Sequence, residues 1–207
     1  MTSIMNFITG KKNYKPKVYK LKEGDSSIIY YENIPEEIAV DKKTFEKLWK
    51  LHPEEFGIVK IMGKLIKTPR WQQSYGKSYK FSGVIHDFLP IPDGYVKKLL
   101  EWVCKHSGKE YNQVLINWYE GNQHYINFHS DNEDELVKDS DIYSFSFGET
   151  RDFIIKSKKT DFKQTFSVHN NCLIIMGGQC QQFYLHSVPK RVGNTGRRIN
   201  ITFRLFK

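Results

Sequence analysis

The chain contains little cysteine and no long hydrophobic run. The three cysteines among its 207 residues, Cys104, Cys172 and Cys180, form no C-x-x-C pair and would leave one thiol unpaired in any disulfide scheme. This scarcity argues against a disulfide-stabilised secreted domain and against a thiolate zinc site, and it predicts a reducing, intracellular compartment. No stretch approaches the roughly 18 apolar residues of a membrane-spanning helix, and the N-terminus lacks a secretory signal pattern. We therefore expect neither secretion nor a membrane span.

Basic residues are in excess. The chain has 32 Lys and Arg residues against 23 Asp and Glu residues, which gives a net charge of +9. Because acidic residues remain numerous, we interpret the excess as a basic surface for a polyanionic partner, with nucleic acid as the leading candidate. The length and the 39% hydrophobic content fit one domain with one sizeable core. We expect the protein to act as a monomer.

The first half of the chain predicts an irregular N-terminal arm and two helices. Residues 1–35 are polar and lysine-rich, and we expect an irregular arm with one short strand within residues 26–34. The segment "DKKTFEKLWKL" predicts a helix that is capped by Asp41 and stops near Pro53. The segment "PDGYVKKLLEWVCKHSG" predicts a second helix that opens after Pro92 and ends at Ser107-Gly108.

Short strands dominate the chain after Gly108. The aromatic residues of "YSFSF" alternate with serines, as in a sheet with one packed face. So many short strands behind two amphipathic helices predict a β-sandwich or jelly roll whose helices cover one sheet. The expected strands are residues 114–119, 142–148, 151–156, 172–176, 182–188 and 198–206.

One histidine motif could form a metal site. His129-x-Asp131 lies in "INFHSDNEDE", but about one His-x-acid triplet is expected by chance in this composition, and His52-Pro53-Glu54 is a second one. A solvated loop histidine is therefore the alternative. If His186 lies on a strand of the same jelly roll, it can join His129 and Asp131 as the facial triad of a non-haem iron(II) oxygenase. Zinc could use the same ligands, although a structural zinc site wants a closed fourth ligand.

The last predicted strand carries polar side chains on one face. They follow one another at period two, and four such groups are costly to bury without partners. They form either an exposed edge face or a clamp for a carboxylate, since guanidinium groups pair with carboxylates in bidentate fashion. Another predicted strand offers two further donors. The residues are Arg198, Asn200, Thr202 and Arg204 on the last strand and Asn117 and Tyr119 on the other.

Taken in order, these motifs resemble the AlkB family of Fe(II)/2-oxoglutarate dioxygenases, which repair alkylated nucleic acid bases. The motifs are Asn117-x-Tyr119, His129-x-Asp131, "SFGETRDF", His186 and Arg198-x-Asn200-x-Thr202-x-Arg204. The resemblance runs from about residue 55 to the C-terminus, and "PRWQQSYGKSYKFSG" and "HSDNEDEL" are most similar to the eukaryotic DNA-repair branch. It implies a mainly β fold with flanking helices around a double-stranded β-helix. Residues 1–54 would be an N-terminal arm and helix, and residues 55–207 a nucleotide-recognition region with the dioxygenase jelly roll.

The resemblance also implies a reaction. The enzyme would demethylate bases such as 1-methyladenine and 3-methylcytosine in DNA with Fe(II), O2 and 2-oxoglutarate, releasing formaldehyde, succinate and CO2. The alternatives are an RNA demethylase of the same family, a non-catalytic basic nucleic-acid-binding module, and a dioxygenase that acts on protein or lipid. Iron would be held by His129, Asp131 and His186. Arg198 with Tyr119 and Asn200 would bind the distal carboxylate of 2-oxoglutarate, and Arg204 with Asn117, near Thr202, its metal-proximal end.

Further residues are assigned by the resemblance to base recognition. The flipped base would stack between Phe81 and the ring of His129, beside Tyr79, although Tyr79 and Phe81 could equally be strand core. Glu133 would attract a cationic methylated base, and Asn132 would either contact the base or face solvent. In "KIMGKLIK", a hairpin tip of Ile61, Met62 and Gly63 would fill the vacated stack, with Lys64 on a phosphate. Met62 would otherwise pack under the hairpin, and we interpret Arg151 and Asp152 as a structural ion pair.

Overall fold

The main sheet of the protein forms the larger layer of a sandwich. The computed structural model describes residues 15–61, 63–81, 84–86, 88–193 and 195–207, and this sheet has eight strands. Its pairs are antiparallel except for the last one, β5 with β8. In spatial order the strands are β1 (Lys17–Lys20), β2 (Ser26–Tyr31), β14 (Cys172–Gly178), β11 (Ile142–Gly148), β16 (Arg197–Arg204), β9 (Gln113–Glu120), β5 (Trp71–Tyr75) and β8 (Phe88–Leu89).

A smaller sheet forms the second layer. It has four strands in the order β10 (Ile126–His129), β15 (Tyr184–Val188), β12 (Arg151–Ser157) and β13 (Lys163–Val168). Side chains from both sheets, such as Phe153 and Ile155 from β12 and Ile142 from β11, share one buried cluster. Two sheets that close over a common core in this way form the jelly roll that the sequence predicts.

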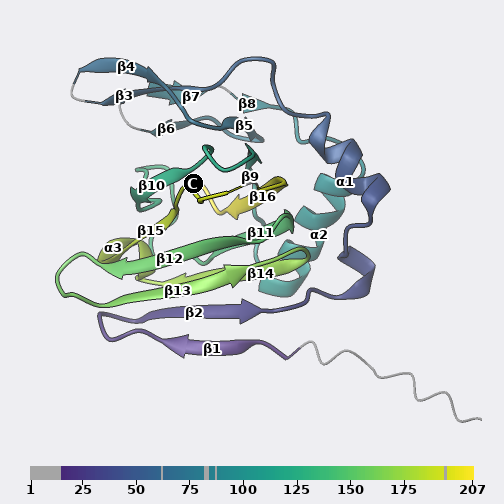
Figure 1. The fold of residues 1–207 in the computed structure, drawn as a ribbon. Helices are drawn as coiled ribbons and strands as arrows, with labels where there is room; N and C mark the ends of the chain where they lie inside the picture. The colour runs from purple at the N-terminus through teal and green to yellow at the C-terminus, as the bar shows by residue number, and fades with distance from the viewer. Residues whose placement is uncertain (1–14, 62, 82–83, 87, 194) are drawn as a thin grey trace, which may run out of the picture.

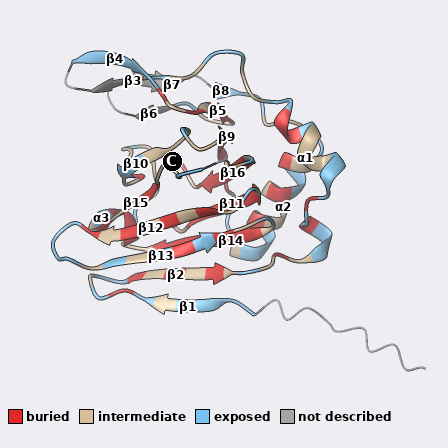
Figure 2. Cartoon of the chain, in the orientation of Figure 1, coloured by how far each residue is buried: buried red, intermediate tan, exposed pale blue. Residues whose placement is uncertain are grey.

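Two hairpins project beside this sandwich. They are β3 (Ile58–Ile61) with β4 (Lys64–Lys67) and β6 (Tyr79–Phe81) with β7 (Val84–His86). Figure 1 shows both above β10, on the side of the molecule where β10 and β15 lie. The exposed strand β4 contrasts with the buried centre of the main sheet (Figure 2).

The outer face of the main sheet is covered by two helices. In α1 (Lys42–Trp49), the side chain of Asp41 accepts the backbone N–H of Thr44, as expected for an N-cap. In α2 (Tyr95–Ser107), the chain leaves the helix through Gly108 at a φ of 68°, where glycine is favoured. Both helices pack into one core cluster with the aromatic side chains of β11. No helix of the described residues is long and apolar enough to cross a membrane.

Three local expectations differ from the structure. The arm contributes β1 in addition to the expected strand β2, and a short 3-10 helix, η1 (Glu36–Ile38), follows it. The expected strand over residues 182–188 begins only at Tyr184, because a one-turn helix, α3 (Cys180–Phe183), precedes it. The serines of β11 are buried as well as its aromatic residues, because that face of the strand lines the interior of the sandwich.

Candidate metal and co-substrate site

The register of two neighbouring strands places two histidines opposite each other. His129 ends β10, and its Cα is paired with that of His186 in β15 across an irregularity between Ile126 and His129. The two imidazole rings are 4.2 Å apart between centroids. The ring of Phe153 stacks on the ring of His186, with 5.4 Å between their centroids. The histidine pair is therefore held both by backbone pairing and by packing.

Asp131 completes a cluster of three candidate metal ligands. It follows β10 on a loop, and donor atoms of His129, Asp131 and His186 all lie within 4.8 Å of one another. Among the described residues this is the group of His, Cys, Asp and Glu side chains that could hold an ion. Two imidazoles and one carboxylate fit an iron(II) ion that keeps three coordination positions open, and the absence of cysteine is unlike a closed zinc site.

The protonation states of these groups suit metal binding. The His129 Nδ1 lies 2.9 Å from the carbonyl oxygen of Asn127, which can only accept, so Nδ1 carries the proton and Nε2 is left as the ligand atom. Burial, followed by the proximity of His129, lowers the pKa of His186 to about 3. Burial opposes ionisation of Asp131, but Arg204 and the histidines outweigh it and bring its pKa to about 2. At neutral pH the three groups are therefore two neutral imidazoles and a carboxylate.

Arg198 is a buried cation without a carboxylate partner in the part of the chain that the structure describes. Its residue is 1% exposed, and it lies in β16 opposite Tyr119 of β9, with the guanidinium 5.0 Å from the centroid of the Tyr119 ring. The Nη2 donates to Ser146 Oγ at 2.8 Å, whereas Nε and Nη1 have no hydrogen-bond partner among the described residues. Burial lowers the pKa of Arg198. An unpaired buried guanidinium fits the distal carboxylate of a bound dicarboxylate.

The same interior face carries the rest of the predicted clamp. A small cavity extends from the histidines to Arg198 and is lined by Asn117, Tyr119, Asn200, Thr202 and Arg204. Asn200 donates to Ser144 Oγ at 2.9 Å and accepts from Thr202 Oγ1 at 3.2 Å. The period-two polar face is thus an internal surface and not an exposed edge.

Arg204 binds the protein's own carboxylates. Its Nη2 lies 2.8 Å from Asp131 Oδ1, and its Nη1 lies 3.6 Å from Glu133 Oε1. In this structure it therefore stabilises a candidate metal ligand, in addition to any contact with a co-substrate. The predicted role of Arg204 with Asn117 at the metal-proximal end of 2-oxoglutarate stays a prediction.

Sequence reasoning missed Arg70 and Gln72. Arg70 is buried, and its Nε donates to Asn117 Oδ1 at 2.8 Å while its Nη2 donates to Gln72 Oε1 at 3.0 Å. Both side chains line a small cavity with His129 and Asp131. For Gln72 a signal was present in "PRWQQSYG", because Gln72 and Ser74 lie at alternate positions of β5, whereas Arg70 precedes that strand.

The loop after Asp131 holds the predicted base-recognition acid. The Glu133 side chain is 3% exposed, and burial raises its pKa. Neither of its carboxylate oxygens has a hydrogen-bond partner among the described residues. Asn132 is exposed, and its Oδ1 lies 3.4 Å from Ser130 Oγ. Glu133 is thus a buried acceptor beside the candidate metal site, and Asn132 lies at its rim.

The predicted wedge hairpin exists, although only part of it is described. Gly63 turns between β3 and β4 at a φ of 79°, and Lys64 is exposed at the start of β4. Met62 lies outside the described residues, so its predicted role stays a prediction. Tyr79 and Phe81 belong to β6, and their side chains are also outside the described part of the structure.

The structure assigns Arg151 and His52 to contacts other than an Arg151–Asp152 ion pair or a metal site. Arg151 is fully buried and donates to the carbonyl oxygens of His124 and Pro189 at 2.8 and 2.5 Å. It forms no ion pair with Asp152 among the described residues, because neighbouring positions of a strand point to opposite faces. His52 stacks on Trp71 at 4.5 Å, so the chance triplet with Glu54 belongs to an aromatic cluster and not to a metal site.

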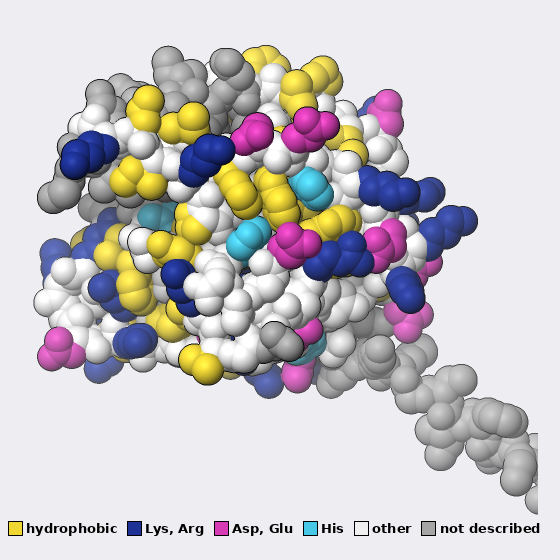
Figure 3. All heavy atoms as spheres, turned by 45° about the horizontal axis from the view of Figure 1, so that its top comes forward, with side chains coloured by type: hydrophobic (Ala, Val, Ile, Leu, Met, Phe, Trp, Pro, Cys, Tyr) yellow, Lys and Arg dark blue, Asp and Glu magenta, His cyan; other side chains and the backbone are white. Residues whose placement is uncertain are grey.

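The hairpin side of the molecule mixes hydrophobic and basic side chains. Exposed Ile58, Leu65 and Ile66 lie on β3 and β4, and exposed Phe88 lies on β8. Lys156 of β12 lies 4.2 Å from the ring centroid of Phe128, beside His129. Figure 3 shows hydrophobic, lysine and arginine side chains together on this face.

Comparisons with known proteins agree with this geometry. Residues 53–204 match the sequence model of the 2OG-Fe(II) oxygenase superfamily. "DNA oxidative demethylase ALKBH2" of Mus musculus is 31% identical over 160 residues, which cover 70% of this chain and 65% of that protein. The Homo sapiens protein of the same name is 32% identical, with 70% of this chain and 60% of that protein covered.

A second group of relatives and one solved structure are also similar. "Alpha-ketoglutarate-dependent dioxygenase alkB homolog 3" of Homo sapiens is 29% identical over 67% of this chain and 52% of its own length. The chain thus spans about half to two thirds of the length of these relatives. The structure of OsALKBH1 superimposes with a TM-score of 0.63 over 91% of this chain and 100% of that chain, at 15% identity. This last similarity supports the fold alone.

We predict that protonation of His186 destabilises the metal-free protein. The pKa of a histidine is about 6.5 when unfolded and about 3 in the folded site, so between these values protons bind the unfolded state preferentially. Stability should fall by on the order of a few kcal/mol as pH decreases from 6.5 toward 3. Urea unfolding in EDTA over this range measures it, and His186→Gln should flatten the profile.

A matched control for this titration is His169→Gln, in the turn between β13 and β14. It should leave the pH profile as steep as in the unsubstituted protein. Equal profiles for His186→Gln and the unsubstituted protein would show that His186 is not the titrating group.

Proposed function

Because the chain belongs to the 2OG-Fe(II) oxygenase superfamily and, within it, to the AlkB family, we propose that it is an oxidative demethylase of N-alkylated bases in nucleic acid. Its cofactor is Fe(II), its co-substrate 2-oxoglutarate and its oxidant O2. The substrates are 1-methyladenine and 3-methylcytosine in DNA, and the products are formaldehyde, succinate and CO2. The relatives named as DNA oxidative demethylases favour DNA over RNA.

The observation that carries this proposal is the unpaired Arg198 at one end of a cavity whose other end is the metal-ligand triad. A binding module would have no use for a buried guanidinium without an anion, since an uncompensated buried charge is strongly destabilising. A dicarboxylate that chelates an ion at His129, Asp131 and His186 could extend its second carboxylate toward Arg198, along the cavity that these residues line. The buried charge of Arg198 is therefore better explained by a co-substrate than by packing.

The protein contributes binding, orientation and dryness to the reaction. Fe(II) and 2-oxoglutarate supply the oxidising power by which O2 hydroxylates an N-methyl group, whose hydroxymethyl form then releases formaldehyde. Arg198 neutralises the distal carboxylate, and the buried face of β9 and β16 excludes water around it. His129 presents its Nε2 to the ion because its Nδ1–H donates a hydrogen bond to the backbone carbonyl of Asn127. No side-chain nucleophile is needed.

Base selection would depend on the paired charges of Glu133 and Arg204. A base methylated as 1-methyladenine or 3-methylcytosine is cationic. It must leave the duplex stack to reach the iron. Glu133 offers it a buried carboxylate whose two oxygens have no hydrogen-bond partner within the described residues. The Nη1 of Arg204 lies 3.6 Å from Glu133 Oε1 and partly neutralises the carboxylates of Asp131 and Glu133. The negative charge that remains would match the single positive charge of the methylated base.

Turnover itself is the direct test. Incubation with Fe(II), 2-oxoglutarate, O2 and an oligonucleotide that contains 1-methyladenine should yield equimolar succinate and formaldehyde. Single- and double-stranded DNA and RNA substrates separate the possible targets. His129→Ala, Asp131→Ala and His186→Ala should each abolish product, whereas His52→Ala should retain turnover per folded molecule. Absence of formaldehyde from every nucleic acid would reject the proposal.

Arg198→Met should weaken co-substrate binding without destabilising the ligand-free fold. Loss of the guanidinium partner should cost about 2 to 5 kcal/mol of 2-oxoglutarate affinity, measured by anaerobic calorimetry with Mn(II) in place of iron. The stability of the ligand-free protein should be equal or higher, because an unpaired buried charge is removed.

The neighbouring arginine provides a matched control for this substitution. Arg197 points to the opposite face, where its Nη1 donates to Glu46 of α1 at 3.2 Å. Arg197→Met should therefore lower stability but keep the affinity for 2-oxoglutarate. The reverse pattern would place the co-substrate elsewhere.

Glu133→Gln should separate base recognition from chemistry. The substitution keeps the shape of the side chain but leaves Arg204 less neutralised, which disfavours a cationic base. Turnover on 1-methyladenine and 3-methylcytosine should fall more than turnover on neutral 3-methylthymine. Asp134→Asn, at the exposed neighbouring position, is the control and should affect none of them. An equal fall on all three bases would assign Glu133 to structure.

A further inference from the structure

The three candidate metal ligands are not held in the same way. His129 and His186 lie on strands and share a backbone register, which fixes their distance. Asp131 lies two residues beyond the end of β10, where no strand pairing positions it. Its carboxylate is oriented by Arg204, but a salt bridge leaves the backbone of the loop free to move. Something else must fix the main chain of Asp131.

The side chain of Gln181 makes that contact. The Asp131 N–H donates to Gln181 Oε1 at 2.9 Å, across 50 positions of sequence. Gln181 is buried in α3, and its Nε2 donates to the sulfur of Met176 in β14 at 3.3 Å. This second bond fixes which end of the amide faces Asp131. The amide therefore joins the metal-ligand loop to the main sheet.

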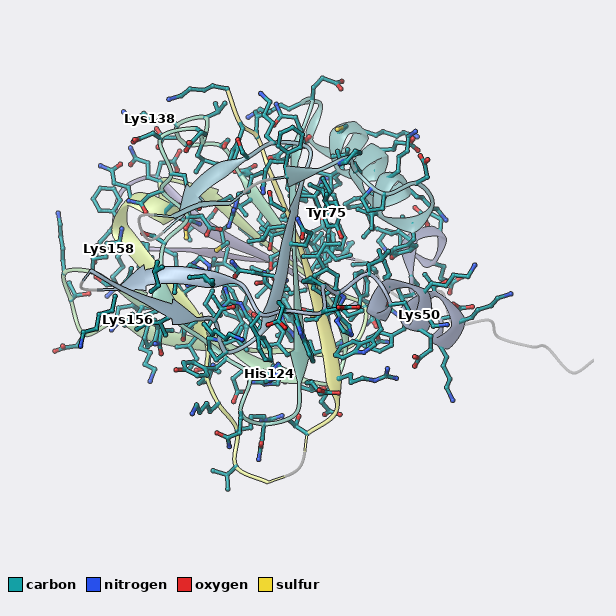
Figure 4. All side chains as sticks on the ribbon, turned by 90° about the horizontal axis from the view of Figure 1, so that it is seen from above. Lys50, Tyr75, His124, Lys138, Lys156 and Lys158 are labelled. Atoms are coloured by element: carbon teal, nitrogen blue, oxygen red, sulfur yellow. The ribbon has the colours of Figure 1, made fainter. Side chains whose placement is uncertain are left out.

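Lys158 secures the same loop from the other side. Its Nζ donates to the hydroxyl of Ser130, between two of the ligands, at 3.1 Å, and to the backbone carbonyl of Gln181 at 2.8 Å. Figure 4 shows Lys158 on the same side of the molecule as Lys138 and Lys156. Ser130, Asp131 and Gln181 are thus connected by three hydrogen bonds that use no strand pairing.

Packing does not replace these bonds. A cavity of about 420 Å³ lies against the loop and is lined by Asp131, Gln181 and Lys158 among other residues. On this side the loop faces open space in place of packed side chains. Since α3 leads directly into β15, a bond from α3 to Asp131 also relates the third ligand to His186, six residues from the start of α3.

We propose that Gln181 is a positioning residue of the metal site. Its side-chain carbonyl fixes the backbone of Asp131, and Lys158 braces the adjoining Ser130, so that the third ligand is in place before an ion binds. Groups that orient metal ligands in this way typically contribute 10- to 100-fold to metal affinity. The proposal rests on the proposed function only in that the triad binds a metal.

Metal affinity without nucleic acid tests the inference. Gln181→Met removes the acceptor at similar volume and should weaken Mn(II) binding by about 10- to 100-fold, measured by calorimetry or by the EPR signal of free Mn(II). Gln181→Glu keeps an acceptor oxygen and adds a negative charge near the ion, so it should bind Mn(II) at least as tightly as the unsubstituted protein. The melting temperature in EDTA shows whether each variant is folded.

Gln182→Met is the matched control, because Gln182 is the next residue of α3 and is exposed. It should bind Mn(II) like the unsubstituted protein. If Gln181→Met does not fold, Gln181→Asn, whose amide is too short to reach Asp131, should show the same loss. The inference is overturned if the Gln181 variant binds Mn(II) as tightly as the Gln182 variant, or if Gln181→Glu is as weak as Gln181→Met. Tight Mn(II) binding with no turnover would reject the proposed function but leave this inference intact.

Discussion

The ion pair between Arg204 and Asp131 is the interaction on which the interior of this protein depends. Both side chains are 3% exposed, and a carboxylate at that depth would take up a proton without a cation beside it. A protonated Asp131 could not serve as an anionic ligand. Arg204 in turn comes from β16, an interior strand of the main sheet, so the ionisation of a loop residue is set by a strand that is paired on both sides.

Two arginines on one face of β16 have opposite relations to the protein. Arg204 is compensated by internal carboxylates, whereas Arg198 has no carboxylate partner among the residues that the structure describes. A dication and a dicarboxylate that enter together leave the net charge of the interior unchanged, and each offsets the desolvation cost of the other. The charges of the residues that line the site therefore favour joint binding of the two groups over the binding of either group alone.

Much of this arrangement could be predicted from local residue patterns. The remainder consists of contacts between residues that are far apart in the sequence, which local patterns do not indicate. Alternation identified β11 and β16, and the period-two polar residues identified the lining of the cavity. Alternation could not show that Ser144 and Ser146 are buried, because a polar residue opposite a packed face usually meets solvent. The four residues of α3 are too few for a helical period, so nothing indicated that Gln181 would reach Asp131. Arg70 stood outside any regular pattern.

The folded core includes residues that precede the range matching the superfamily. Residues 53–204 match, yet β2 pairs along β14, with Leu173 opposite Tyr31 and Gly178 opposite Ser26, and Leu48 of α1 lies in the main core. A polypeptide trimmed to the matched residues would turn β14 into an open edge strand and uncover apolar surface. Such an edge recruits other chains, so the trimmed protein should aggregate, and β2 and α1 should protect the longer chain from self-association.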